Sequence, residues 1–194
     1  MATAKVDLTS GGAASGKVVF RACAILAAIG AIFTLAFFRG CDERSDGKVQ
    51  TVKLGGKAFH LEVADTDEVR IKGLGQRDHI EPDGGMLFVF TTPKVSAFVM
   101  RDCAIDIDII YLDQYGKVIT TYEMKKEPAR GADGKDEGKV GDNNLAYENR
   151  LKKYDSRLPM QYVIEIKGGT LPSLNLKEGD KIDLPLAQLK SRAK

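Results

Sequence analysis

Charged side chains interrupt apolar runs in the segment from Asp83 to Asp113, DGGMLFVFTTPKVSAFVMRDCAIDIDIIYLD. Two carboxylates, Asp106 and Asp108, are two residues apart in a run that is typical of a β-strand. Strand alternation places both on one face, roughly 7 Å apart. Such a pair suits a metal ion or acid–base chemistry. Solvated carboxylates at a strand edge, or an ion pair between Asp108 and an arginine, would explain the same pattern.

The candidate cations for this region are Arg77 and Arg101. A guanidinium can bind a carboxylate with two hydrogen bonds, whether that carboxylate belongs to the protein or to a ligand. An internal salt bridge is therefore one alternative, and a ligand-binding face is the other. The residues that we expect to line such a face are Arg77, Met100, Arg101, Asp102 and Asp108.

Other catalytic chemistry finds little support in the residue spacing. Cys103 would need a nearby base to act as a nucleophile, and nothing ties His60 or His79 to it, so an inert thiol is favoured. No Cys and His spacing is typical of a zinc site, and Asp133–Asn144 departs from a calcium loop, because its third position is Lys135. We therefore assign no catalytic residue and predict no metal site and no cofactor.

Composition narrows the class of protein. The formal net charge is only +2, whereas proteins that bind nucleic acids usually carry a strongly basic surface. The cysteines, Cys23, Cys41 and Cys103, are too sparse for a disulfide scaffold. A chain of 194 residues fits one domain with an appendage.

An uncharged apolar run, Ala22–Phe38, follows Lys17 and Arg21. Its length is near the roughly 17–25 residues of a transmembrane helix. The preceding basic residues favour an N-terminus in the cytoplasm. We expect a single-pass anchor in the cell membrane, with the C-terminal domain outside the cytoplasm. A lipoprotein signal that ends at Cys41 is the alternative, although Arg39 matches such a signal poorly.

The chain divides into five parts on these grounds. They are a disordered cytoplasmic N-terminus at 1–21, a transmembrane anchor or signal segment at 22–39, a linker at 40–48, a β domain at 49–186 and a C-terminal tail at 187–194.

Periodicity predicts the elements of the β domain. A hairpin is expected over Val49–Ala64, because alternating residues flank Gly55-Gly56. Thr66 is expected to cap one short helix that ends at Gly73. Met86–Phe90 is apolar on both faces, which is typical of a central strand.

Further strands are expected along the rest of the domain, at Ala97–Arg101, Ile105–Leu112, Lys117–Met124, Met160–Lys167 and Lys177–Leu184. Lys125–Pro159 is expected to be a long solvated loop with a weak helix near Leu145–Tyr154. The fold class that follows is mainly β, a largely antiparallel domain with one short helix.

Short motifs in the β domain occur in a recognisable order. They are Val69-Arg70 with Gly73-Leu74-Gly75-x-Arg77, then Gly85–Phe90 (GMLFVF), Phe98–Cys103 (FVMRDC), Ile105–Ile109 (IDIDI) and Gly179-Asp180. In these motifs the chain resembles the family of domain of unknown function 192, which is uncharacterised and found in bacteria and archaea. The resemblance implies a small β-rich fold, barrel-like or jelly-roll-like, and places Asp108 at the family's Asp.

The chain departs from the family pattern in and beside the expected site. Val99 stands where the family usually has Trp, Asp102-Cys103 where it has Asn-Thr, Asp106 where it has Pro, and Gly75 where it has Met. An activity of the family therefore need not be retained here.

The sequence favours a membrane-tethered, exported β domain that serves as a binding or accessory module of the cell envelope. Its expected partners are the membrane, through Ala22–Phe38, and a small-molecule or envelope-protein ligand. No nucleic-acid partner is expected. The alternative is a small enzyme, a hydrolase or a metal-dependent catalyst, that uses Asp108 and nearby arginines.

Overall fold

The computed structural model describes residues 48–132, 138 and 144–194. These residues belong to the unit that runs from Ser45 to Lys194. The expected membrane anchor Ala22–Phe38 lies outside them. Within the described residues, no helix is long and apolar enough to span a membrane.

The predicted hairpin is confirmed. Strands β1 (Val49–Leu54) and β2 (Lys57–Ala64) pair antiparallel around Gly55 and Gly56. These glycines have φ of +55° and +81°, the left-handed values that a two-residue hairpin turn of this type requires. A Cβ atom on Gly55 would also lie 2.4 Å from the Leu174 carbonyl oxygen, so the turn can sit against that segment only with glycine there.

The helix after β2 is also formed as predicted. Helix α2 (Asp67–Lys72) begins at Thr66, whose Oγ1 accepts a hydrogen bond from the Val69 N–H (3.4 Å). It ends at Gly73, where φ is +52°. Because the chain crosses over through α2, β2 and the next strand, β3 (Gly84–Lys94), run parallel, which departs from an all-antiparallel expectation.

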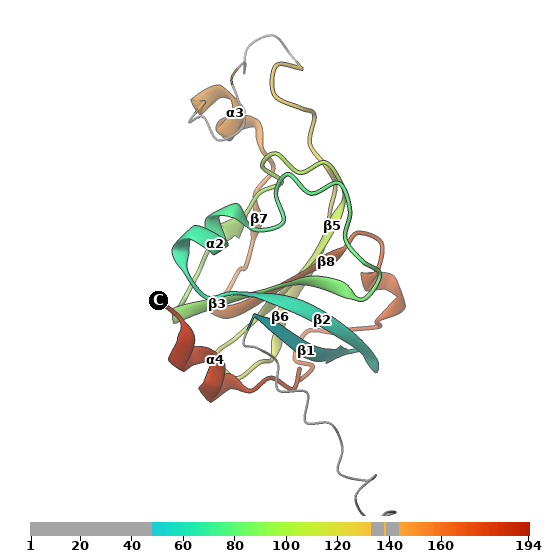
Figure 1. The fold of residues 1–194 in the computed structure, drawn as a ribbon, viewed down its shortest axis with the longest axis vertical. Helices are drawn as coiled ribbons and strands as arrows, with labels where there is room; N and C mark the ends of the chain where they lie inside the picture. The colour runs from blue at the N-terminus through green and yellow to red at the C-terminus, as the bar shows by residue number, and fades with distance from the viewer. Residues whose placement is uncertain (1–47, 133–137, 139–143) are drawn as a thin grey trace, which may run out of the picture. The chain divides into compact units, whose positions relative to one another are not determined.

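The main sheet has six strands, in the order β1-β2-β3-β8-β5-β6 (Figure 1). Strands β5 (Ile107–Leu112), β6 (Val118–Met124) and β8 (Met160–Lys167) complete it. The expected central strand at Met86–Phe90 is confirmed within β3, between β2 and β8. Over the described residues the two outer strands, β1 and β6, do not pair with each other. The mainly β class is therefore confirmed, and the barrel-like closure is corrected to an open sheet.

The remaining elements are short. Strand β4 (Ala97–Phe98) pairs with β7 (Tyr154–Asp155) in a second, two-stranded sheet. Helix α3 (Leu145–Arg150) is the weak helix expected near Leu145–Tyr154. The 3-10 turn η1 (Leu171–Ser173) and helix α4 (Leu186–Arg192) were not expected. The strand expected at Lys177–Leu184 is reduced to a single bridge between Lys117 and Lys181.

Apolar side chains fill both faces of the main sheet. The first core cluster lies on the side of the hairpin and α4, and includes Val52, Leu61, Leu87, Ile164 and Leu189. The second core cluster lies on the other face, and includes Leu74, Met86, Phe88, Ile109 and Val163. Figure 1 shows α2 and α4 on opposite sides of the sheet, one beside each cluster.

The described part of Lys125–Pro159 is not the solvated loop that its composition suggests. Tyr147 in α3 is 1% exposed, and Leu151 and Tyr154 are each 3% exposed. Their positions, i, i+4 and i+7, have the spacing of an apolar face along a helix, although α3 itself ends at Arg150. They fix the segment against the domain beside β4.

Candidate functional site

A groove of about 610 Å³ opens beside the second core cluster. One side is formed by α2 and the turn Gly73–Gln76, and the other by β4 and the residues that follow it, as far as Cys103. Its volume lies within the range of about 300–1,000 Å³ that is usual for ligand pockets. We call it the α2–β4 groove.

Aromatic rings form the apolar part of this groove. Phe88, Phe90 and Phe98 all line it. The rings of Phe88 and Phe98 meet edge to face, with centroids 5.2 Å apart, and Phe98 meets Tyr111 in the same way at 5.7 Å. Because Phe88 belongs to the central strand β3 and is 1% exposed, this floor is held by the core of the domain.

Ion pairs neutralise most of the charge along the rim. Arg101 donates two hydrogen bonds to the Glu148 carboxylate (2.7 and 2.6 Å), which raises the pKa of the guanidinium. Arg130 binds Asp102 in the same two-fold manner, at 2.7 and 3.0 Å. Each of these residues lines the groove, and each carries a hydrogen bond to its opposite charge.

The rest of the rim carries a small positive surplus. Arg70 is paired with Asp67 at 2.8 Å. The other charged lining residues are Lys72, Lys94 and Glu68, and within the described part of the chain none of them is in an ion pair. The Lys94 ammonium lies 4.5 Å from the centroid of Phe90, at the edge of the apolar floor.

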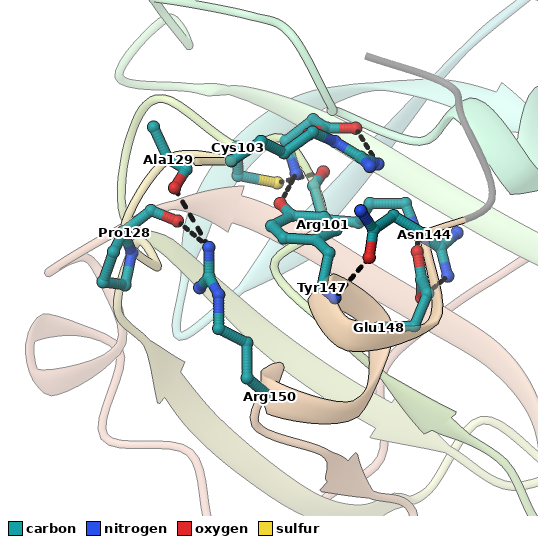
Figure 2. Close-up of polar contacts among 10 residues, drawn as sticks. Arg101, Cys103, Pro128, Ala129, Asn144, Tyr147, Glu148 and Arg150 are labelled. Carbon is teal, nitrogen blue, oxygen red and sulfur yellow. Dashed lines mark hydrogen bonds and ion pairs between the residues drawn. The ribbon is translucent and has the colours of Figure 1, made fainter. Parts of the chain in front are cut away.

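Helix α3 lines the groove through Glu148, and its Tyr147 is bonded to the groove residue Asp102. The Asp102 N–H donates to the Tyr147 hydroxyl (2.8 Å), and the Arg130 and Arg150 guanidinium groups lie 4.0 and 4.8 Å from its ring centroid. Figure 2 shows Tyr147 between Arg150 and the chain near Cys103. Asp102 has φ of +52°, a conformation that Asp and Asn tolerate better than most residues.

Cys103 lines the groove but is not an activated thiol. Burial raises its pKa to about 12, and the negative charges of Glu165 and Asp102 act in the same direction. Its Sγ lies 3.4 Å from the Arg101 carbonyl oxygen, to which it donates. A thiol with this pKa is protonated at neutral pH and is therefore a poor nucleophile.

The structure brings together two of the expected site residues, Arg101 and Asp102, in the groove. Met100, between them, is 1% exposed and belongs to the second core cluster. Arg77 is not among the residues that line the groove. It donates to both carboxylate oxygens of Glu62, at 2.6 and 2.8 Å.

Asp108 lies on the opposite face of the sheet, in strand β5, and is 1% exposed. Its Oδ2 accepts a hydrogen bond from the Leu171 N–H (2.7 Å), at the start of η1. Its Oδ1 is buried, and no partner for it is found within the described residues. The expected arginine partner is therefore replaced by a backbone amide.

Asp106 and Asp108 do not form a shared carboxylate site. Asp106 precedes β5 and accepts from the Lys126 N–H (2.9 Å) and the Lys125 ammonium (3.1 Å), which lower its pKa. Across the described residues, no group of three or more His, Cys, Asp and Glu side chains is placed to hold a metal ion.

Glu165 is a buried acid that the sequence analysis missed. It lies in β8 opposite Met86 and Ile109, is 6% exposed, and has a pKa raised to about 8 by burial. Its side chain alternates along β8 with Tyr162, Ile164 and Ile166, and it is buried because β8 is central and both of its faces are covered.

The fold and the groove together define a mainly β domain with an open, ligand-sized groove. The family model of domain of unknown function 192 (DUF192), described as "Uncharacterized ACR", matches residues 50–184. The chain therefore belongs to the DUF192 family, as its motifs indicated.

Two crystal structures share the fold. One is a protein from Sinorhizobium meliloti 1021 described as a candidate transcription regulator, which is 24% identical with a TM-score of 0.51, over 70% of this chain and 90% of that one. The other is a protein of unknown function from Novosphingobium aromaticivorans DSM 12444, which is 23% identical with a TM-score of 0.53, over 73% of this chain and 89% of that one. A comparison with curated proteins finds no significant match. Likeness at this level of identity concerns the fold alone.

Proposed function

We propose that this domain is a ligand-binding module whose ligand occupies the α2–β4 groove. An apolar part of the ligand would lie on Phe88, Phe90 and Phe98, and an anionic group would face Lys72 and Lys94. The observation that carries the proposal is an open groove of about 610 Å³ with an aromatic floor. Of the rim charges that are in no ion pair within the described residues, two are lysines and one is a glutamate.

Binding is favoured over catalysis by the state of the groups in the groove. Arg101 and Asp102 are each engaged in a two-fold hydrogen-bonded ion pair, and the Cys103 thiol is protonated at neutral pH. A general acid or base must reach the reacting atoms, and a nucleophile must be activated. Asp108, the basis of the enzymatic alternative, lies on the other face of the sheet.

The groove is also arranged before any ligand arrives. The floor rings of Phe88 and Phe98 are fixed by an edge-to-face contact, and the side chains of Arg101 and Asp102 are held by their ion pairs with Glu148 and Arg130. A site that is ordered in advance loses less conformational entropy on binding.

The setting of the module is part of the same proposal. The apolar run Ala22–Phe38 would tether the domain to the cell membrane, with residues from 49 onward outside the cytoplasm as an accessory module of the envelope. The support for this part is the sequence of the run and of the basic residues before it.

Photolabelling tests the binding site. The full-length chain in detergent micelles is irradiated with a trifluoromethyl-diazirinyl benzoate, which carries an aromatic ring and a carboxylate, and labelled peptides are mapped by mass spectrometry. We expect saturable labelling concentrated on residues 67–76 and 96–103. The matching benzamide, which lacks the charge, should label about two- to fivefold less, as expected for exposed charge interactions.

Two matched variants locate the label. Ile71 lines the groove and is 76% exposed, and Leu158 is 60% exposed and does not line it. Ile71→Glu should weaken labelling about tenfold, because it removes apolar contact and adds a negative charge, and Leu158→Glu should leave it unchanged. Labelling that is scattered over the chain, or equal in both variants, would overturn the proposal.

A further inference from the structure

We propose that the ligand of the α2–β4 groove is an extended peptide segment, which adds as a strand to the free edge of β4 and carries an apolar side chain beside an acidic one. This inference rests on the proposed function, because it names the ligand class of the same groove. Three features carry it, namely the backbone of β4, the aromatic floor and the charge of the rim.

Among the residues that the structure describes, β4 forms its backbone hydrogen bonds along one edge. The Ser156 N–H donates to the Ser96 carbonyl oxygen (2.9 Å), and the pairing continues with Ala97 opposite Asp155 and Phe98 opposite Tyr154. In an antiparallel pair, alternate residues direct their N–H and C=O groups to the partner strand. Ser96 and Phe98 therefore face β7, and the backbone groups of Ala97 and Val99 face away from it.

The other edge of β4 borders the groove. Ala97 and Val99 both line it, and Ala97 is exposed. Within the described residues, β4 has β7 as its sole strand neighbour. An uncovered strand edge is a template for another strand, and main-chain hydrogen bonds of this kind supply affinity in many peptide-recognition domains.

The side chains of a strand bound there would meet two kinds of surface. Successive residues of a strand point to opposite sides, so alternate side chains can enter the groove while their neighbours lie along its rim. The floor offers Phe88 and Phe98 to an apolar side chain. The rim offers the ammonium groups of Lys72 and Lys94, which favour an acidic residue in the peptide.

A peptide explains the groove better than a ligand without a backbone. Ala97 lies in β4, and its N–H and C=O groups are directed away from β7, where another strand can pair with them. A small aromatic acid would use the floor and the lysines and leave these groups to water.

Selection from a phage-displayed hexapeptide library identifies the probe. The library is panned on the full-length chain in nanodiscs, with counter-selection on Ile71→Glu, and the recovered peptides are synthesised with a fluorescent label. We expect peptides that pair an apolar residue with Asp or Glu. Fluorescence anisotropy should show dissociation constants tighter than about 1 mM that weaken at least tenfold in Ile71→Glu and not in Leu158→Glu.

Backbone substitution then tests strand addition itself. Ala97→Pro removes an N–H that is not directed to β7, which is a position where an edge strand tolerates proline. It should weaken peptide binding at least tenfold, and the size-matched control Ala97→Val, which keeps the N–H, should not.

N-methylation of the peptide gives a second test that leaves the protein intact. Methyl groups at alternate residues should abolish binding, and those at the intervening residues should be tolerated.

The outcomes separate this inference from the proposed function. If no peptide binds, or if binding ignores both Ala97→Pro and the position of the methyl group, strand addition is wrong. The benzoate label in the groove would still stand, and the module would bind a ligand of another class. If the benzoate label also misses the groove, the proposed function fails with it.

Discussion

Glu165 gives the domain a stability that depends on pH. Burial raises the pKa of its carboxyl group from 4.5 to about 8. Below the unfolded value, both the folded and the unfolded chain carry the proton. As the pH rises toward 8, the unfolded chain ionises first, so folding stability falls through this window.

Glu165→Gln removes this titration. Relative to the variant, the wild-type chain should lose free energy of unfolding between pH 5 and pH 8.5, on the order of 3 kcal/mol at about 1.4 kcal/mol for each pKa unit. Urea unfolding of both proteins across this range measures the difference. If the free energies of unfolding of the two proteins changed in parallel with pH, Glu165 would already be ionised in the folded domain at low pH.

Asp108 links the sheet to η1 through a single hydrogen bond, from the Leu171 N–H. Asp108→Ala removes the acceptor and leaves a buried donor, so it should lower the free energy of unfolding by about 1–3 kcal/mol. Asp108→Asn retains an acceptor oxygen of the same reach for the Leu171 N–H. Its free energy of unfolding should therefore be within about 1 kcal/mol of wild type. Urea midpoints in which Asn is more damaging than Ala would contradict this account.

At the residue scale, the location of the candidate site could be predicted from the sequence, but the contacts of its residues could not. Arg101 and Asp102 do line the groove, because the FVMRDC motif follows directly on β4. Their partners, Glu148 and Arg130, come from the segment expected to be a solvated loop, and no local pattern pairs them with Arg101 and Asp102. The partner of Asp108 is a backbone amide 63 positions away in sequence, and no side-chain pattern reports a backbone amide.

Among the elements, α3 is joined to the groove by the side chains of Tyr147 and Glu148. The Tyr147 hydroxyl accepts from the Asp102 N–H and so joins the segment around α3 to the groove. Tyr147→Phe deletes that contact and should destabilise the local packing by about 1 kcal/mol. Limited trypsin cleavage, which we expect first within Lys125–Lys153, should then be about fivefold faster.

Tyr115→Phe is the matched control for this experiment, because Tyr115 is 61% exposed and lies in the turn before β6. Its cleavage rate should equal that of wild type. Equal rates for Tyr147→Phe and wild type, or first cleavage within β3, would show that α3 is not held by this hydroxyl.

Elements with local signals were predictable, and those that depend on distant contacts were not. The glycine pair at residues 55 and 56 and the Thr66 cap act within a few residues, and both are found as predicted. The parallel pairing of β2 with β3 depends on the whole crossover. Helix α4 lies in the stretch expected as a tail, and Arg192 near its end pairs with Asp65 at 2.9 Å.

At the scale of the whole molecule, the tether is a prediction about Ala22–Phe38, which lies outside the described residues. The full-length chain should fractionate with membranes and resist carbonate extraction, and a chain that starts at Asp42 should be soluble. Release of the full-length chain by high salt alone would contradict an anchor. A palmitate-analogue label that disappears in Cys41→Ser would favour the lipoprotein alternative.

The central claim is that the α2–β4 groove is where this domain binds its ligand. The most direct measurement is the distribution of the benzoate photolabel along the chain in wild type, Ile71→Glu and Leu158→Glu. The account predicts that the label gathers on residues 67–76 and 96–103, is lost about tenfold in Ile71→Glu, and is retained in Leu158→Glu. A label that gathers on another face of the domain, or that does not distinguish the two variants, would contradict it.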